Sequence, residues 1–458
     1  MKISIQALAI ALAGLAFSAP AAAQYGAPPP PTTSTPDVPS DEDDSDQGRQ
    51  EQPSIRSGSG SAASRSQEKA QPTQQQAADT LTSGRKLDLS KEARKAIIEL
   101  QTAVNANDTA SIPAKLAAAQ AAAKTNDDRY VIAINQIKAA STANDLAGLR
   151  TGIDALRASG GAQPADITAR YNNLGKRLYD AKQLDQAASA FEQSLAVDAN
   201  NVDALKLLAS TRETQGRGSE AVALMAKSLA AAKAAGVKPK ENDYKFAARI
   251  AYDAKAPAAG DITRAWIADY PNPTNWRDAL RIYRDVNGLE GDAKIDVMRL
   301  ARAANALNGE GDYFAYVSEL VTRGYLNEAK AVIDEGGAKK AIDVNKNAFK
   351  QFAPKLAKAP ARSTIDAVAK LGLGSGSGKT AMEAGDSLYG VGAFAEAASL
   401  FKAAAAKGGV DANLANLRLG MALARSGDKP GATAALNAVT GPQANIAKYW
   451  LIWVNGQG

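Results

Sequence analysis

Apolar positions recur every three to four residues over most of the chain from residue 87 onward, and short polar breaks separate these stretches. This spacing places the apolar side chains on one face of a helix. Sustained alternation of apolar and polar residues, the mark of strands, is missing from the same region. The pattern therefore predicts an all-α fold. A capping residue or an early proline precedes an apolar run at three predicted helix starts: Leu89-Ser90, Pro164-Ala165-Asp166 and Asp428-Lys429-Pro430.

The helical pattern repeats at a spacing of 34 residues. Only one of the paired positions, Arg212, differs in character from its counterpart. A period in this range marks stacked supersecondary units, each of which needs its neighbours to bury its apolar face. The chain is therefore predicted to be a solenoid. The paired positions are Tyr171, Leu174, Gly175, Leu178, Ala187, Phe191, Ser194 and Leu195 with Leu205, Leu208, Ala209, Arg212, Ala221, Met225, Ser228 and Leu229.

A shorter signature extends the repeat through the rest of the chain. It consists of an entry residue, usually glycine, then alanine five positions later and a large apolar residue four positions after that. The entry residue ends the first helix of a hairpin, the alanine allows close helix approach, and the large residue fills the gap between hairpins. Its six copies are Lys182/Ala187/Phe191, Gly216/Ala221/Met225, Gly288/Ala293/Val297, Gly324/Ala329/Ile333, Gly392/Ala397/Phe401 and Gly427/Ala432/Leu436.

A different period precedes these copies, since residues 96–108 recur as residues 133–145, 37 positions later. We interpret this pair as diverged helical hairpins that begin the stack, because terminal repeats are often atypical.

Together these residues resemble the tetratricopeptide repeat family, a right-handed superhelix of helix-turn-helix units. The strongest resemblance covers residues 168–230, and a second good stretch covers 381–440. The resemblance is looser over 276–336 and degenerate over 242–271 and 337–372.

The resemblance implies a binding groove, because three positions of each first helix line the concave surface in this family. Leu207 stands where the family's clamp for C-terminal carboxylates has asparagine, so that clamp is not reproduced. The alternative interpretation of the groove positions is an ordinary solvated helix face. The corresponding residues in this chain are Asn172, Lys176, Tyr179, Lys206, Ser210 and Glu213.

The first 23 residues have the composition of a secretory signal peptide. Met1 and Lys2 form a short basic start, residues 3–17 are almost entirely apolar, and alanines at 21–23 suit a cleavage site. The apolar stretch is too short to span a bilayer, which takes about 20 residues. We therefore predict export, a mature chain without a transmembrane segment, and a periplasmic location, with secretion as the alternative.

Residues 24–86 combine proline, serine, glycine and glutamine with an acidic cluster at 41–46. Burial cannot offset the entropy of ordering such a segment, so we interpret it as a disordered linker; an acidic docking motif is the alternative. The predicted organisation is a signal peptide (1–23), this linker (24–86), diverged hairpins (87–160), a tetratricopeptide repeat pair (161–235), degenerate repeats (236–372), and C-terminal repeats with a capping helix (373–458).

The chain of 458 residues contains no cysteine and no histidine. Thiolate nucleophiles, imidazole bases and the usual zinc ligands are therefore absent. No catalytic residue, no cofactor and no metal ligand is predicted, and the chain is expected not to be an enzyme.

Three motifs resemble catalytic ones. Residues 374–380 look like a phosphate-binding loop, but Leu373 stands where that loop needs glycine, and residues 365–371 are predicted to be helix rather than strand. Residues 331–334 resemble a magnesium-binding strand but fall inside a repeat helix. Two Ser-x-x-Lys spacings fall in the linker without a companion motif. We interpret residues 374–380 as a connection between repeats.

The predicted function is a scaffold or adaptor of the cell envelope that binds proteins. Residues 87–458 carry a net charge of +8, which makes an anionic glycan a second candidate partner. A glycan-binding or glycan-processing envelope factor is the alternative function. Nucleic acid is not expected as a partner, and the oligomeric state stays open. The apolar run at 449–454 predicts a final helix docked on the last repeat or, alternatively, a partner contact.

Overall fold

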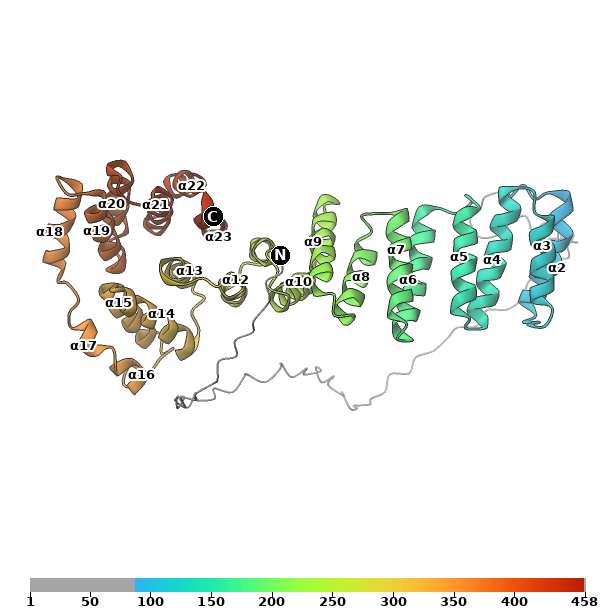
Figure 1. Ribbon diagram of the computed structural model, residues 1–458, viewed down its shortest axis with the longest axis horizontal. Coiled ribbons are helices and arrows are strands. Elements are labelled where there is room, and N and C mark those ends of the chain that lie inside the picture. Colours follow the sequence, from blue (N-terminus) through green and yellow to red (C-terminus); the bar gives the residue numbers. More distant parts are fainter. Residues whose placement is uncertain (1–86, 457–458) are drawn as a thin grey trace, which may run out of the picture. The chain divides into compact units, whose positions relative to one another are not determined.

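The structure, a computed structural model, describes residues 87–456 (Figure 1). Helices and short turns make up this part of the chain, which contains no strand. None of the helices within it is long and apolar enough to cross a membrane. The predicted signal peptide, the linker and both Ser-x-x-Lys spacings lie outside the described residues.

The described chain is a succession of helices with one short 3-10 turn before the last. Apart from α16, α17 and α22 they are 11 to 17 residues long. Their bounds are α2 Lys91–Asn105, α3 Ile112–Ala122, α4 Asn126–Thr142, α5 Leu146–Ala158, α6 Pro164–Asp180, α7 Leu184–Val197, α8 Val202–Thr214, α9 Gly218–Ala234, α10 Glu241–Asp253, α11 Ala259–Asp269, α12 Pro273–Val286, α13 Gly291–Ala303, α14 Gly309–Arg323, α15 Leu326–Ala338, α16 Asn347–Lys350, α17 Ala353–Leu356, α18 Arg362–Leu373, α19 Gly378–Gly390, α20 Phe394–Lys407, α21 Ala412–Ser426, α22 Lys429–Asn437, η1 Gly441–Gln443 and α23 Ala444–Asn455.

The three predicted helix starts are confirmed. Ser90 caps α2 by accepting a hydrogen bond from the Ala93 amide, and Asp428 caps α22 by accepting one from the Gly431 amide. Pro164 occupies the first position of α6. These residues suit the helix N-terminus, where the first amide groups have no partner within the helix.

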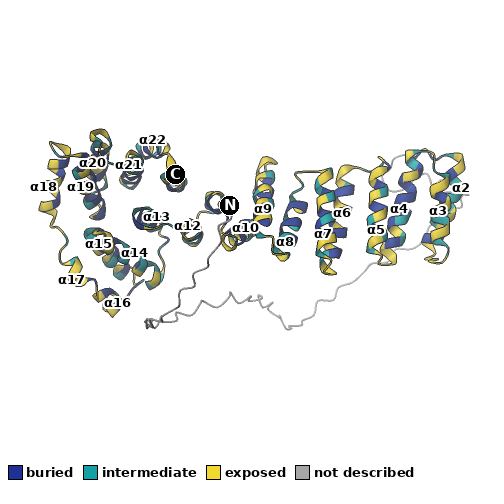
Figure 2. Cartoon of the chain, in the orientation of Figure 1, coloured by how far each residue is buried: buried dark blue, intermediate teal, exposed yellow. Residues whose placement is uncertain are grey.

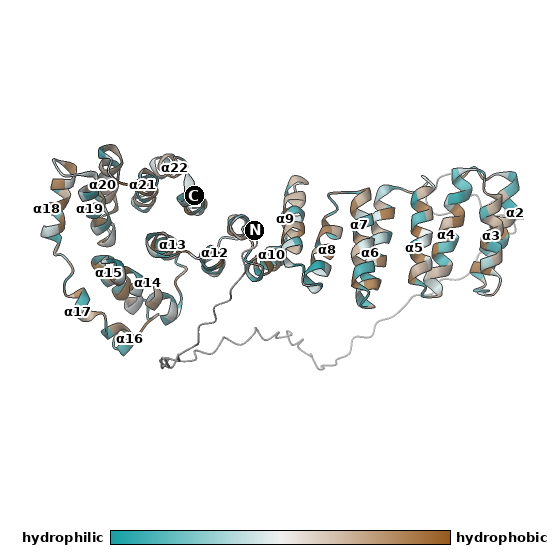
Figure 3. Ribbon diagram, viewed as in Figure 1, coloured by the Kyte–Doolittle hydropathy of each residue, from teal (hydrophilic) through white to brown (hydrophobic). Residues whose placement is uncertain are grey.

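Neighbouring helices pack as hairpins, among them α6 with α7, α8 with α9, α19 with α20 and α21 with α22. Hydrophobic and hydrophilic residues occupy different sides of these helices (Figure 3). The solenoid of helical repeats is therefore confirmed.

The entry residue of every repeat copy has a positive φ. This conformation ends the first helix of the hairpin and allows the second helix to begin, as the signature predicts. Five copies have glycine there, and Lys182 is the exception, at a cost of about 1–2 kcal/mol for its side chain. The six angles are 62° at Lys182, 75° at Gly216, 56° at Gly288, 82° at Gly324, 83° at Gly392 and 89° at Gly427.

The 37-residue repeat shows the same device with asparagine. Asn107 and Asn144 occupy equivalent positions and have φ angles of 54° and 53°. They separate α2 from α3 and α4 from α5, so both predicted hairpins are present.

The alanine and the large apolar residue of the signature fill the hairpin interfaces. Phe191 is 1 % exposed and lies against Gly175 of the preceding helix, and Phe401 lies against Gly385 in the same way. A β-carbon at Gly385 would approach the Phe401 ring to 2.7 Å, so only glycine leaves enough space. Two copies depart from the pattern, because Ala293 and Ile333 are only partly buried.

The final helix does more than cap the last repeat. α23 packs on α21 and α22, and also on α11 and α13. The Tyr449 hydroxyl lies 2.6 Å from the Thr263 hydroxyl and donates to the Gly260 carbonyl at 3.2 Å. The Tyr449 and Tyr283 rings lie 4.9 Å apart. The apolar run at the C-terminus is therefore an intramolecular contact that joins the two ends of residues 259–455.

Candidate functional site

The six predicted groove residues lie on α6 and α8, which are neighbours in the stack. Three of them converge on one cavity of about 300 Å³ between these helices: Lys176 and Tyr179 from α6, and Ser210 from α8. Phe191 and Leu207 supply an apolar wall, and Asp180 and Thr211 complete the lining. The cavity thus combines one cation, three hydroxyl groups, one carboxylate and an apolar surface.

The polar groups of this cavity keep some of their hydrogen-bonding capacity. Lys176 is exposed and has no ion pair among the described residues. The Tyr179 hydroxyl lies 2.9 Å from the Thr214 hydroxyl, so one of its two hydrogen-bonding roles is used. Such groups suit the carbonyls and carboxylates of an extended peptide.

The other three predicted groove residues are not part of the cavity. Asn172 is 8 % exposed and donates a hydrogen bond to Asn201 at 3.3 Å. It therefore helps to pack α6 against the N-terminus of α8. Lys206 lies 3.6 Å from Asp243. Glu213 accepts from Arg249 at 2.7 Å.

The segment that resembles a phosphate-binding loop directs backbone carbonyl groups, and not amide groups, towards a charged side chain. The Lys407 ammonium donates to the carbonyls of Gly372, Gly374 and Gly376 at 2.6, 2.6 and 2.9 Å. A phosphate cradle instead directs amide groups inward. The segment follows α18, a helix as predicted, and residues 331–334 likewise lie within α15. No group of three or more histidine, cysteine, aspartate or glutamate residues could hold a metal ion within 87–456.

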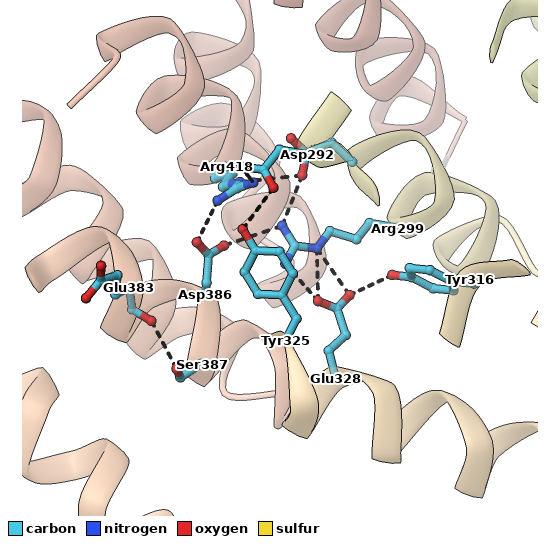
Figure 4. Close-up of polar contacts among 10 residues, drawn as sticks. Asp292, Arg299, Tyr316, Tyr325, Glu328, Glu383, Asp386, Ser387 and Arg418 are labelled. Carbon is cyan, nitrogen blue, oxygen red and sulfur yellow. Dashed lines mark hydrogen bonds and ion pairs between the residues drawn. The ribbon is translucent and has the colours of Figure 1, made fainter. Parts of the chain in front are cut away.

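A buried ionic cluster is the feature that sequence inspection missed (Figure 4). It joins helices far apart in the chain: α13, α15, α19 and α21. The two arginines are at most 2 % exposed, and three of the carboxylates are at most 7 % exposed. The cluster comprises Asp292, Asp296, Arg299, Glu328, Asp386 and Arg418.

Arg299 is the centre of the cluster. Its guanidinium forms a bidentate pair with Glu328, with Nη2 to Oε2 at 2.7 Å and Nε to Oε1 at 3.1 Å. It also donates to Asp296 at 3.0 Å and to Asp386 at 3.4 Å. The Tyr316 hydroxyl donates to Glu328 at 2.6 Å. This fork geometry uses the planar guanidinium in a way that lysine cannot reproduce.

Arg418 links α21 to the same carboxylates. Its Nη1 donates to Asp386 at 2.6 Å, and its Nη2 lies 3.2 Å from Asp292. The Tyr325 ring lies 5.7 Å from its guanidinium and 5.2 Å from that of Arg299. The cluster therefore holds residues 291–338 to residues 378–426 through charge and aromatic contact.

Charge is not balanced among the buried groups, since two guanidiniums face three buried carboxylates. Burial raises the pKa of the Asp386 carboxyl to about 6, even though Arg418 and Arg299 oppose this. Burial also raises the pKa of Asp296. Burial acts the same way on Glu328, but Arg299 and the Tyr316 hydroxyl outweigh it and hold that pKa below its usual range. The two aspartates are therefore the groups of the cluster that take up a proton more readily than an ordinary aspartate, which relieves the excess of negative charge.

A polar cavity of about 380 Å³ adjoins the cluster. Glu328 and Asp386 line its inner side, and Arg323, Glu383 and Ser387 line the side nearer solvent. Exposed Glu383 lies 3.9 Å from Lys379. Water therefore has a path to the edge of the ionic cluster.

Stability should depend on pH through Asp386. The pKa of Asp386 is higher in the folded chain than the ordinary aspartate value of 3.8, so its contribution is present at low pH and is lost as pH rises through about 6. We expect the Asp386→Asn variant to lose less stability than the wild type between pH 5 and pH 7.5. Urea unfolding followed by circular dichroism across this range measures the difference. Parallel pH profiles for the two proteins would contradict the assignment.

Sequence did carry one signal of the cluster. Arg299 and Arg418 each interrupt an apolar stretch on the buried side of a helix, Val297-Met298-Arg299-Leu300 and Leu417-Arg418-Leu419. A charge in such a position needs a buried partner. The partners could not be named, because Glu328 and Asp386 lie 29 and 87 residues from Arg299.

Comparison with known proteins identifies the repeats. The profile of the tetratricopeptide repeat family matches residues 172–236 and 382–452. No curated protein matches the chain. Among solved structures, a tetratricopeptide repeat protein from Parabacteroides merdae is 13% identical, with 64% of this chain and 99% of that chain covered and a TM-score of 0.27. PilF from Pseudomonas aeruginosa is 14% identical, with 50% of this chain and 98% of that chain covered and a TM-score of 0.23.

Proposed function

We propose that this chain, a tetratricopeptide repeat protein, is an adaptor of the bacterial cell envelope that binds protein partners through the cavity between α6 and α8. The repeat fold itself supports a role as a protein–protein interaction scaffold. One observation carries the choice of surface. Lys176, Tyr179 and Ser210, three residues placed in the groove by the family resemblance, line one cavity.

The chemistry of this cavity favours an extended peptide as ligand. Lys176 attracts a carboxylate, the Tyr179 and Ser210 hydroxyls bind backbone carbonyls, and Leu207 and Phe191 accept an apolar side chain. A cavity of about 300 Å³ holds one or two side chains rather than a folded domain. The partner is therefore expected to present a flexible segment or a terminus.

The proposed envelope location rests on the first 23 residues, whose basic start, apolar run and small residues match a secretory signal. Its test is to separate periplasm from cytoplasm in the native host and to determine the N-terminus of the mature chain. Recovery of the intact chain in the cytoplasm would contradict the proposal.

The groove is tested by crosslinking in cells. A photo-crosslinking residue at Tyr179 or Ser210 should capture the same partner, and Lys176→Glu should weaken binding of that purified partner by about tenfold or more, the loss of one charge-assisted hydrogen bond. The matched control is the crosslinker at Ala196, which is exposed on α7 outside the cavity. Equal capture at Ala196, or full affinity of Lys176→Glu, would contradict the proposed surface.

Binding assays with the purified protein distinguish the glycan-binding alternative from the protein adaptor. Purified protein that is retained on peptidoglycan or lipopolysaccharide up to high salt, while the crosslinker captures no protein, would favour a glycan-binding factor. Turnover of peptidoglycan or nucleotide by the purified protein would contradict a non-enzymatic adaptor.

A further inference from the structure

Positive charge is concentrated in one short stretch of the chain. Residues 346–362 carry five basic side chains and no acidic one, whereas the net charge of all 458 residues is only +6. The five are Lys346, Lys350, Lys355, Lys358 and Arg362. We call residues 346–373 the basic segment. It comprises α16, α17 and α18, and most of its residues are exposed (Figure 2).

The first part of the basic segment, α16 and α17, packs on the repeats through the apolar residues of one side. Phe349 and Phe352 are buried, and their rings lie 6.2 and 5.7 Å from that of Phe314. Leu356, which is partly buried, follows four residues after Phe352. Because these residues are spaced three and four apart, they share one side of the segment. The nearby lysines at 350, 355 and 358 are exposed to solvent.

Three of these lysines are not used by the fold. Lys350, Lys355 and Lys358 are exposed and form no ion pair within the described residues. In contrast, Lys346 pairs with Glu310 at 2.6 Å, and Arg362 pairs with Glu396 at 2.7 Å. A run of unpaired lysines raises the local potential and contributes nothing to folding.

Exposed apolar side chains follow the lysines along the chain. α18 buries Ile365 and Ala369 against its neighbours but leaves Val368 36%, Leu371 50% and Leu373 52% exposed. Hence the basic segment presents both ammonium groups and large apolar groups to solvent. An acidic polypeptide or a soluble polyanion would use only the first of these. The interface of a bilayer uses both, because headgroup phosphates attract lysine and the acyl boundary accepts apolar side chains.

We propose that the basic segment binds the surface of a bilayer that carries anionic phosphate headgroups. This goes beyond the adaptor function and does not depend on the groove, since no residue of the basic segment lines the cavity between α6 and α8. The contact is peripheral and is weakened by salt, because the lysines lie in water at high dielectric until they meet the surface.

The test is co-sedimentation of the full chain with vesicles. Vesicles of phosphatidylcholine and phosphatidylglycerol in equal parts should bind the protein, and vesicles of phosphatidylcholine alone should bind it much less. The variant Lys350→Gln/Lys355→Gln/Lys358→Gln should lose about two orders of magnitude in partitioning, because each lysine near an anionic surface contributes about fivefold. Leu371→Ser should also lower binding, by about threefold or more.

The matched control removes three lysines elsewhere. Lys91, Lys124 and Lys227 are exposed and have no ion pair within residues 87–456, so Lys91→Gln/Lys124→Gln/Lys227→Gln has the same net charge as the test variant. It should bind anionic vesicles like the wild type. All the proteins share residues 1–86, so any contribution of those residues is common to them.

Four results would overturn the proposal. They are equal loss in the test and control variants, no preference for phosphatidylglycerol, binding that persists at about 0.5 M salt, where charges are screened within a few ångströms, and full binding by Leu371→Ser. Tighter binding of the full chain to polyglutamate than to the anionic vesicles at matched charge would assign the lysines to an acidic polypeptide and would equally overturn it. Partner capture at Ser210 is unaffected by any of these results.

Discussion

Replacing Arg299 with methionine is expected to destabilise the C-terminal repeats by about 3–5 kcal/mol. The guanidinium is fully buried and contacts Glu328, Asp296 and Asp386. Methionine has similar length but removes the bidentate partner of Glu328 and leaves Arg418 to face the three buried carboxylates. Urea unfolding monitored by circular dichroism measures the loss, and hydrogen exchange should show early opening of α15 and α19.

A matched control removes an arginine from a partly exposed ion pair, so that the loss of charge can be distinguished from the effect of burial. Arg277→Met breaks a 2.7 Å pair with Asp312 in which both side chains are partly exposed, and should cost at most about 1 kcal/mol. The double variant Arg299→Met/Glu328→Leu should recover part of the lost stability, because it removes an unpaired buried charge together with its partner. Equal effects of Arg299→Met and Arg277→Met would show that the cluster does not hold the repeats together.

Phe191→Ala is expected to cost about 3–5 kcal/mol, because it opens a cavity in the interface of the α6–α7 hairpin. Phe191 is 1 % exposed and lies against Gly175, which has no side chain of its own to fill the space. The equivalent Phe401→Ala should behave alike, since Phe401 is 0 % exposed and lies against Gly385. The shift of the urea midpoint measures both.

Phe314→Ala provides the comparison for this pair. Phe314 is 38% exposed, so its removal should cost clearly less than that of Phe191. A Phe191→Ala melt that coincides with the wild type would contradict the role given to the signature. Unequal losses for Phe191 and Phe401 would instead show that equivalent positions relax to different extents.

The repeat could be predicted from the chain because its determinants are local. Helix starts depend on residues within one turn, such as Ser90 and Asp428, and hairpin turns depend on single positions that take a positive φ. Two copies of the signature show the limit of such local information. Ala293 and Ile333 fit the spacing but are only partly buried, because spacing indicates the face of a helix and not what packs opposite that face.

The groove was predictable only in part. Helical spacing and the family resemblance indicated six residues on α6 and α8, yet Lys206 and Glu213 pair with residues of α10 and Asn172 packs within the stack. Which of the six face a shared cavity depends on how the next hairpin is placed. That placement follows from side-chain packing between repeats, which spacing within one repeat does not describe.

By itself, the sequence determined that the chain is a stack of helical hairpins, where most of them begin and turn, and that histidine and cysteine chemistry is absent. Only the tertiary structure decided that α23 packs on α11 and that Arg299 and Arg418 meet the carboxylates of α13, α15 and α19. The physical reason is range. Helix periodicity and capping depend on residues about three to five positions apart. The partner of a buried charge depends instead on which side chains the tertiary fold places within about 3 Å of it.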